Sequence, residues 1–490
     1  MTPALLIGIP AFFALLMPLF ALMKNIEPRF LVVLFCLFLL LFPLGMLDDL
    51  QEGGVIIQRI RLFFLFNFTF SMGFLELLFV ALFSLIALII AMYGISTQPS
   101  TTTPKEELYQ STAFLFALSG SFGMLLSNDI GNLLLFCLCT DFALYILIKK
   151  ALNTQNLKHT YLRSNAISAL FMILGVITLY LLLGETNMYY FAQKLPAANG
   201  AGIYLAAGFL LLSFAIKSEL FPFNLWVAPV YENGDMHHIT LFTAITTKAH
   251  FIALIQLLGI FFTLSPLFGH ALIAIGGISM LLASLTMLLK EDSLRRILAR
   301  SGVVQIGLIT MTLGFNLAKL NEGVFFYLIN HSLAFALIYL SVGYLMRSLG
   351  SDRLSTLRGC ALSMPVSALF FTLGAMSLVG FPPFLGFLSK LLILKGFADY
   401  QLFLPILAIF IASLCENVLY LRIISILYAH KAATATPNTP NLTHLPMIIL
   451  GAILLVLGFI PSILFLLVGG GAEEFMQGKI LLPAGIKAFQ

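Results

Sequence analysis

Several ionisable side chains lie deep inside apolar stretches of this sequence. Lys248 follows Ile239 by nine residues, in a stretch that stays apolar to about Leu264. At about 1.5 Å per helical residue, its ammonium group lies roughly 14 Å into a hydrocarbon layer about 30 Å thick. The other ionisable residues in such stretches are Asp141, Lys217, His250, His331 and Lys390. Charges at this depth are costly unless paired or hydrated, so together they predict a charge relay across a membrane.

The composition is typical of an integral membrane protein. Hydrophobic residues make up 60% of the chain and charged residues 10%, which excludes a soluble domain. No connecting segment is long enough for a separate soluble domain. We predict an all-α fold of about 14 transmembrane helices, near residues 4–23, 30–47, 73–95, 112–127, 130–148, 165–183, 203–222, 239–264, 270–289, 302–316, 323–345, 365–395, 402–428 and 445–468.

The loop cations predict how these helices are oriented. Fourteen crossings place both termini on the same side, with fifteen Lys and Arg residues in one set of loops and seven in the other. The positive-inside rule puts the larger set in the cytoplasm and both termini on the non-cytoplasmic side. We therefore expect a multi-pass protein of the cell inner (plasma) membrane. The loop bias explains the net charge of +5 and requires no nucleic-acid partner.

Two of the predicted helices, the seventh and the twelfth, carry proline close to a lysine. Pro222 follows Lys217 by five residues, and Pro382 and Pro383 precede Lys390. Proline removes an intrahelical hydrogen bond, and in lipid the freed backbone groups are tolerated only where protein or water satisfies them. Broken helices at corresponding places in two halves predict an inverted-repeat transporter; two simple kinks are the alternative.

The repeat prediction divides the chain into four parts. Residues 1–110 form helices 1–3, and residues 111–264 form the first antiporter-like repeat, helices 4–8. Residues 265–428 form the second, inverted repeat, helices 9–13. Residues 429–490 comprise a loop, helix 14 and the tail. Each repeat then contains five helices, one of them broken.

Motifs along this length resemble a known family. KSELFPFNLW (217–226) resembles K-x-x-x-x-P-F-H-x-W, and SLVGFPPFLGFLSK (377–390) resembles the twelfth-helix L-A-G-x-P-P-x-x-G-F-x-x-K. Further similar segments are TTKAHFIALIQLL (246–258), KEDSLRRILARSGVVQIG (290–307), INHSLAFALIYL (329–340) and the arginine-bearing ENVLYLRII (416–424). The family comprises antiporter-like proton-translocating subunits of complex I, membrane-bound hydrogenases and multisubunit sodium/proton antiporters. The similarity is nearest to the N-type subunit of complex I or the D-type subunit of the antiporters, as a divergent branch.

The resemblance implies roles for the buried ionisable residues. In the family, a carboxylate on the fifth helix pairs with a lysine on the seventh, which here is Lys217. A lysine on the eighth helix, here Lys248, is the central proton carrier. A residue on the twelfth, here Lys390, faces the exit side. His331 and His250 are candidate shuttles, because histidine titrates most easily near neutral pH; packed, hydrogen-bonded histidines are the alternative.

The sequence departs from the family pattern at several of these positions. The fifth-helix glutamate falls at Leu138, and Asp141, three residues later, either replaces it or pairs elsewhere. Phe335 stands at the lysine of the N-H-A-L-F-K motif. Glu219, beside Lys217, either retunes that lysine or faces water at the broken helix.

We therefore predict a proton-translocating subunit of a redox-driven ion-pumping complex. It would be a non-redox subunit of an enzyme like NADH:quinone oxidoreductase or a membrane-bound hydrogenase. The alternatives are a subunit of a multisubunit sodium/proton antiporter, or a structural membrane-arm subunit whose relay is impaired by Leu138 and Phe335. Expected partners are other membrane-arm subunits, the lipid bilayer and protons, with sodium as the alternative ion. No nucleotide, flavin, cluster or metal motif is present, so we expect no cofactor in this chain.

Overall fold

The computed structural model describes residues 2–20, 27–46, 55–62, 66–97, 103–148, 155–194, 200–262, 265–289, 291–430, 443–468 and 487–489. Outside the described residues lie six of the loop cations used to predict orientation: Lys24, Lys149, Lys150, Lys290, Lys431 and Lys479.

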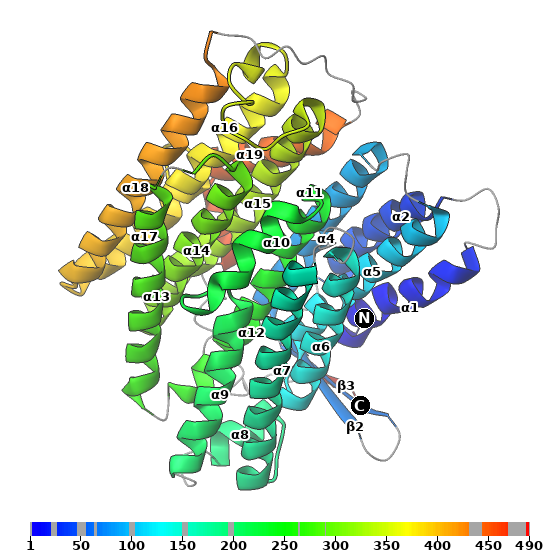
Figure 1. Cartoon of the computed structure of the whole chain (residues 1–490). Coiled ribbons are helices and arrows are strands. Elements are labelled where there is room, and N and C mark those ends of the chain that lie inside the picture. Colours follow the sequence, from blue (N-terminus) through cyan, green and yellow to red (C-terminus); the bar gives the residue numbers. More distant parts are fainter. Residues whose placement is uncertain are drawn as a thin grey trace.

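The described part of the chain is mostly helical (Figure 1). The α-helices are α1 (Pro3–Phe20), α2 (Pro28–Leu41), α4 (Phe74–Thr97), α5 (Pro104–Leu126), α6 (Ile130–Ile148), α7 (Gln155–Leu183), α8 (Met188–Lys194), α9 (Ala201–Lys217), α10 (Val227–Asn233), α11 (Met236–Leu241), α12 (Thr247–Phe261), α13 (Pro266–Met287), α14 (Leu294–Leu313), α15 (Ala318–Leu349), α16 (Pro365–Val379), α17 (Leu385–Asp399), α18 (Phe403–Leu427), α19 (His444–Phe459) and α20 (Ser462–Val468). The shorter helical turns are η1 (Phe42–Met46), η3 (Phe223–Trp226), the π-helical η4 (Phe242–Thr246) and η5 (Cys360–Leu362).

The helices form one bundle that extends from α1 and α2 at one edge to α17 and α18 at the other (Figure 1). Among the described residues, eight helices are long and apolar enough to cross a membrane, and four shorter apolar helices accompany them. The two most buried are the continuous segment Met236–Phe261, which comprises α11, η4 and α12, and α15. Lys248 and His331 lie on these two helices and therefore at the centre of the bundle.

The prediction of an all-α chain is wrong at one end of the bundle. Two strands, β1 (Ile56–Leu62) and β2 (Phe66–Met72), pair antiparallel from Ile56↔Met72 to Leu62↔Phe66. A third strand, β3 (Lys487–Phe489), pairs parallel to β1, so the sheet order is β2-β1-β3. Apolar and polar residues alternate along β2 with the period of two that favours a strand.

Both ends of the chain meet at this small sheet. The backbone N–H of Ala4 donates a hydrogen bond of 3.0 Å to the Gln58 side chain on β1. Phe489 on β3 is the strand partner of the same Gln58. The two termini therefore lie at the same end of the bundle.

Asp129 fixes the start of α6 at this end. Its Oδ1 accepts hydrogen bonds from the backbone N–H groups of Gly131 (2.8 Å) and Asn132 (3.1 Å), which would otherwise be unpaired in the first turn. The Thr186 hydroxyl donates to Oδ2 at 2.5 Å. Burial raises the pKa of Asp129 above its ordinary value. These bonds set the position of α6, which carries Asp141.

Glycine allows α13 and α14 to pack with their backbones in contact. A Cβ on Gly307 would lie 2.6 Å from the backbone nitrogen of Met280, closer than unstrained atoms approach. Close approach at small residues is a common basis of helix association in membranes.

Gly307→Ala is therefore expected to lower the stability of the protein by about 1–3 kcal/mol, the usual cost of overpacking. Gly208→Ala is the matched control, because nothing lies within 4 Å of a Cβ there. Thermal unfolding of the purified variants should show a lower transition temperature for Gly307→Ala and little change for Gly208→Ala. Equal transition temperatures would show that the α13–α14 contact can relax at no cost.

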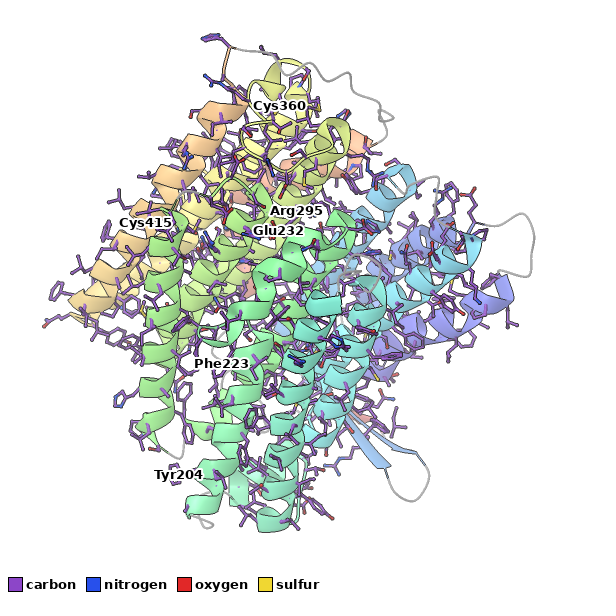
Figure 2. All side chains as sticks on the ribbon, in the orientation of Figure 1. Tyr204, Phe223, Glu232, Arg295, Cys360 and Cys415 are labelled. Atoms are coloured by element: carbon purple, nitrogen blue, oxygen red, sulfur yellow. The ribbon has the colours of Figure 1, made fainter. Side chains whose placement is uncertain are left out.

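The opposite end of the bundle holds a group of ion pairs. Arg296 contacts Glu232 on α10 at 2.7 Å, and Arg295 contacts Asp352 at 3.6 Å. Figure 2 shows Glu232 and Arg295 close together at this end. Arg300 contacts Glu291 at 3.2 Å. These arginines belong to the loop set predicted to be cytoplasmic, and they join the start of α14 to α10.

Candidate functional site

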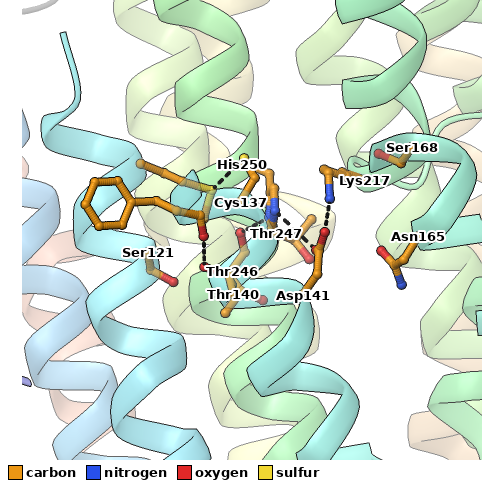
Figure 3. Close-up of polar contacts among 12 residues, drawn as sticks. Ser121, Cys137, Thr140, Asp141, Asn165, Ser168, Lys217, Thr246, Thr247 and His250 are labelled. Atoms are coloured by element: carbon orange, nitrogen blue, oxygen red, sulfur yellow. Dashed lines mark hydrogen bonds and ion pairs between the residues drawn. The ribbon is translucent and has the colours of Figure 1, made fainter. Parts of the chain in front are cut away.

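Lys217 and Asp141 form a buried ion pair. Lys217 is the last residue of α9, and its Nζ donates a hydrogen bond to Oδ2 of Asp141 on α6 (Figure 3). The Lys217 side chain is 2% exposed and that of Asp141 is 13% exposed. The predicted contact between these two residues is confirmed.

His250 faces the same pair from α12. Its Nε2 lies 3.8 Å from Asp141 Oδ1, and its Nδ1 lies 2.8 Å from the carbonyl oxygen of Thr246 (Figure 3). A carbonyl only accepts, so Nδ1 carries the proton and Nε2 of the neutral ring is a free base. A proton bound at Nε2 would sit beside the carboxylate. His250 therefore belongs to the Asp141–Lys217 cluster.

Leu138 lies on the outer surface of α6. Its side chain is 38% exposed, whereas Asp141 is turned toward α9. A carboxylate at position 138 would point out of the bundle, so the position of Asp141 suits a pair with Lys217 and that of Leu138 does not.

Side chains form hydrogen bonds with the backbone N–H and C=O groups left unpaired at the first helix break. After α9 ends at Lys217, the chain turns through η3 into α10. The indole Nε1 of Trp226 donates to the carbonyl of Ile216 at 3.3 Å, and the N–H of Phe221 donates to the Ser279 hydroxyl at 2.9 Å. The break thus contacts α13 and is held by side-chain hydrogen bonds, as backbone at membrane depth requires, while Phe221, Pro222 and Leu225 are exposed.

Glu219 lies within this break and points into the protein. It is 2% exposed, and its Oε1 accepts hydrogen bonds from the Tyr231 hydroxyl and from the Thr247 hydroxyl, the latter at 3.3 Å. Thr247 directly precedes Lys248, so Glu219 lies at the start of α12. The expectation that Glu219 faces water is therefore wrong, because the turn after Lys217 directs the side chain toward α12. An effect of Glu219 on Lys217 stays a prediction.

Lys248 follows the π-helical turn η4 and is 1% exposed. Its Nζ donates a hydrogen bond to the carbonyl of Thr243, five residues earlier, and lies 5.9 Å from the centre of the Phe335 ring. A π-helical turn interrupts regular α-helical bonding, and such turns are frequent at functional sites. The central lysine is thus held by a carbonyl and an aromatic face, and Glu219 bonds to the preceding residue, Thr247.

His331 approaches Lys248 without a hydrogen bond to it. Its ring stacks on that of Phe335, with centres 4.3 Å apart and planes 16° apart. Among the described residues, neither ring nitrogen of His331 has a hydrogen-bond partner, and the residue is 1% exposed. Phe335 therefore contacts both Lys248 and His331, at the position where the family motif has a lysine.

Lys390 lies at the second break, between α16 and α17. Its Nζ donates to the carbonyl of Val379, the last residue of α16, at 3.0 Å. The amide of Asn330, on α15, donates to the carbonyl of Ser377 at 3.5 Å. The Val379 carbonyl freed at this break thus has a side-chain donor, Lys390 itself, and the Ser377 carbonyl also accepts from the backbone N–H of Gly380.

Glu416 on α18 is the site residue that was not predicted. It is 1% exposed, and its Oε2 lies 3.8 Å from Lys390 Nζ. The depth argument that identifies Lys248 also applies to Glu416, which is buried in the apolar helix α18. The motif comparison does not identify Glu416. The segment that contains it, residues 416–424, resembles the family through its arginine, Arg422.

Each of the three buried lysines has a carboxylate from a different element nearby. Lys217 pairs with Asp141 and Lys390 with Glu416, and Glu219 lies near Lys248 through its hydrogen bond to Thr247. Such neighbours can exchange or hold protons, because the charge of one changes the proton affinity of the other. In the described part of the chain, no group of three or more His, Cys, Asp or Glu residues could hold a metal ion.

Comparison with known proteins agrees with this arrangement. Residues 127–415, more than half of the chain, match the family described as NADH:quinone oxidoreductase/Mrp antiporter, TM. The chain belongs to this family. The match includes both broken helices and Asp141, Lys217, Lys248 and Lys390. The resemblance inferred from the motifs is confirmed.

Members of the NADH:quinone oxidoreductase/Mrp antiporter family with different names are similar to this chain. The D-type subunit of the Na(+)/H(+) antiporter of Alkalihalophilus pseudofirmus is 27% identical over 83% of each chain. An N-type subunit of the NADH-quinone oxidoreductase of Herpetosiphon aurantiacus is 29% identical over 73% of this chain and 75% of its own. A chain of the archaeal membrane-bound sulfane sulfur reductase has the same fold, with a TM-score of 0.89, 23% identity and coverage of 98% and 99%. This protein is thus an antiporter-like integral membrane subunit.

Proposed function

We propose that this subunit translocates protons within a redox-driven, multisubunit membrane complex. The proton path comprises the Asp141–Lys217 pair with His250, then Lys248 with Glu219, and finally Lys390, with His331 between the centre and the exit. One observation carries the proposal: three lysines that are nearly inaccessible to solvent each lie near a carboxylate and beside a broken or π-helical segment.

Proton transfer through such a chain follows from the charges. When Lys217 is protonated, it is stabilised by Asp141; a proton arriving at His250 Nε2 competes for the same carboxylate, because that nitrogen faces its other oxygen. The weaker pairing between Lys217 and Asp141 then favours transfer of the Lys217 proton toward Lys248. Glu219 stabilises the proton at Lys248 until it moves on toward Lys390. Each step moves one proton and leaves the backbone in place.

The proposal includes the membrane arrangement expected from the sequence. The chain crosses the membrane about 14 times, with both termini on the non-cytoplasmic side. Residues 111–264 and 265–428 are inverted repeats of five helices, preceded by residues 1–110 and followed by residues 429–490. In this arrangement α9 corresponds to the α16–α17 pair, so Lys217 and Lys390 occupy equivalent breaks on opposite sides of the membrane.

Exchange of sodium for protons is the second candidate. The name of the similar Na(+)/H(+) antiporter protein favours it, since that relative is similar over most of both chains. A structural subunit with an impaired relay is the third, and the Phe335 ring, which contacts both Lys248 and His331 at the position of the motif lysine, favours it. In an antiporter, Lys217, Lys248 and Lys390 would also carry protons. In a structural subunit they would have no role in transport.

The native complex decides between these candidates. We expect mass spectrometry of the purified complex to identify redox subunits beside other membrane-arm subunits. In sealed vesicles, turnover of the redox partner should drive proton movement without a sodium requirement. Copurification with antiporter subunits alone, together with sodium-dependent proton movement, would favour the antiporter. Assembly without proton movement would favour the structural role.

A further inference from the structure

Glu416 occupies a site built to accept hydrogen bonds. Its Oε1 accepts from the amide of Gln305 at 2.6 Å and from the hydroxyl of Ser301 at 3.1 Å. The Tyr420 hydroxyl donates to Ser301 Oγ at 2.9 Å, so the Ser301 proton is free to point at Glu416. An ionised carboxylate only accepts hydrogen bonds, so two donors on one oxygen suit the charged form.

The other carboxylate oxygen faces a cation. Oε2 of Glu416 lies 3.8 Å from Lys390 Nζ, which also contacts the Val379 carbonyl and lies 6.0 Å from the Tyr327 ring centre. The other titratable groups facing Glu416 are Tyr327 on α15 and Tyr420 on α18. Lys390 is thus the nearest positive charge, and Glu416 is buried with it on the inside of the bundle.

Helix α14 joins this pair to the centre of the relay. Ser301 contacts Glu416, and the adjacent Gly302 faces Glu219, since a Cβ there would lie 3.7 Å from Glu219 Oε2. The Phe335 ring lies 3.9 Å from the same point. Two consecutive residues of α14 therefore separate the carboxylate beside Lys248 from the carboxylate beside Lys390.

We propose that Glu416 is a permanently ionised partner of Lys390 and that its charge returns a proton to this lysine after each release at the exit. The inference rests on the proposed function and adds to it a residue beyond the family match, which ends at residue 415. Glu416 is a positioning residue: it acts through Lys390, which carries the proton.

The cycle at this pair is balanced in charge and protons. In the loaded state, the Lys390 ammonium faces the Glu416 carboxylate. Lys390 then loses one proton toward the exit and becomes a neutral amine, which leaves Glu416 as an uncompensated buried anion. Such an anion is unfavourable at low dielectric, so the next proton from the Lys248 side is drawn to Lys390. Glu416 neither gains nor loses a proton.

The test compares Glu416→Gln and Glu416→Asp with the wild type in the intact complex, reconstituted in vesicles. Asp399→Asn is the matched control, because Asp399 is also paired with a lysine, Lys319, at 2.7 Å, but the pair is exposed. The hydrogen bond from Lys319 holds the pKa of Asp399 below its ordinary value, so the control also removes a charge. Proton transport is measured as a function of pH.

When the Glu416 charge is removed, Lys390 binds a new proton less readily. In the wild type, transport falls above the pH at which Lys390 no longer binds a proton. We expect this alkaline limit to move to lower pH by about 1–3 pH units in Glu416→Gln, the range for loss of an opposite charge within about 4–6 Å. Glu416→Asp keeps the charge and should shift the limit by less. An unchanged limit in Glu416→Gln, or equal shifts in both variants, would overturn the proposal.

Infrared difference spectra provide a readout that does not require transport. Subtracting the Glu416→Gln spectrum from that of the wild type should reveal a carboxylate band, and a carboxylic-acid band would overturn the proposal. If the wild-type complex moves no protons, the proposed function fails, while these spectra still decide whether Glu416 is ionised.

Discussion

Replacement of Lys248 by alanine is expected to abolish most proton transport while the complex still assembles. Lys248 is the only lysine of the described part of α12, and alanine at its position cannot carry a proton. A positioned acid–base group contributes about 100- to 10,000-fold to proton-transfer rates, so we expect a loss of roughly 100-fold or more. Glu219 keeps its hydrogen bonds from Tyr231 and Thr247 in this variant, so we expect the complex to assemble.

The initial rate of proton movement in proteoliposomes measures this effect. Lys319→Ala is the matched control, because Lys319 is 63% exposed and forms an exposed pair, which contributes little to stability. We expect the control to transport protons at close to the wild-type rate. Wild-type transport by Lys248→Ala would remove this residue from the mechanism.

The second large effect is expected for Asp141→Asn. This change keeps the shape of the side chain but removes the charge that faces both Lys217 and His250. An opposite charge within about 4–6 Å changes proton affinity by roughly 10- to 1,000-fold, so the variant should lower proton transport by at least about tenfold.

The same vesicle assay should show a severe loss for Lys217→Ala as well, since the two residues act as a pair. If Asp141→Asn transports normally while Lys217→Ala does not, Asp141 is not the functional carboxylate. The added change Leu138→Glu is not expected to restore transport to an Asp141 variant, because position 138 is exposed on the surface of α6.

The long apolar stretches predicted the helical core, and the family motifs predicted the site helices. Lys217, Lys248 and Lys390 could be identified because a cation deep in an apolar stretch violates a strong energetic preference, whatever its neighbours are. The prolines located the two breaks for a similar reason: their effect on helix hydrogen bonding is local. The Asp141–Lys217 contact was predicted only because the resemblance supplied the pairing rule.

Other features depend on contacts between distant parts of the chain. The direction of Glu219 depends on how the chain turns after Lys217, which places it against Tyr231 rather than beside its sequence neighbour. The pairing of Lys390 with Glu416 depends on the packing of α17 against α18. The pairing of β3 with β1 was missed because the two strands lie more than 400 residues apart, whereas β1 and β2 are neighbours in sequence. The alternating pattern in residues 66–72 was nevertheless visible.

The central claim is that the three buried lysines act in series. The most direct test is the number of protons moved per turnover of the partner reaction in the intact complex, with Lys217, Lys248 and Lys390 replaced by alanine one at a time. A serial relay fails at any link, so we predict that each variant lowers this number toward zero while Lys319→Ala leaves it unchanged. A wild-type number in any of the three lysine variants would contradict a single path through all of them.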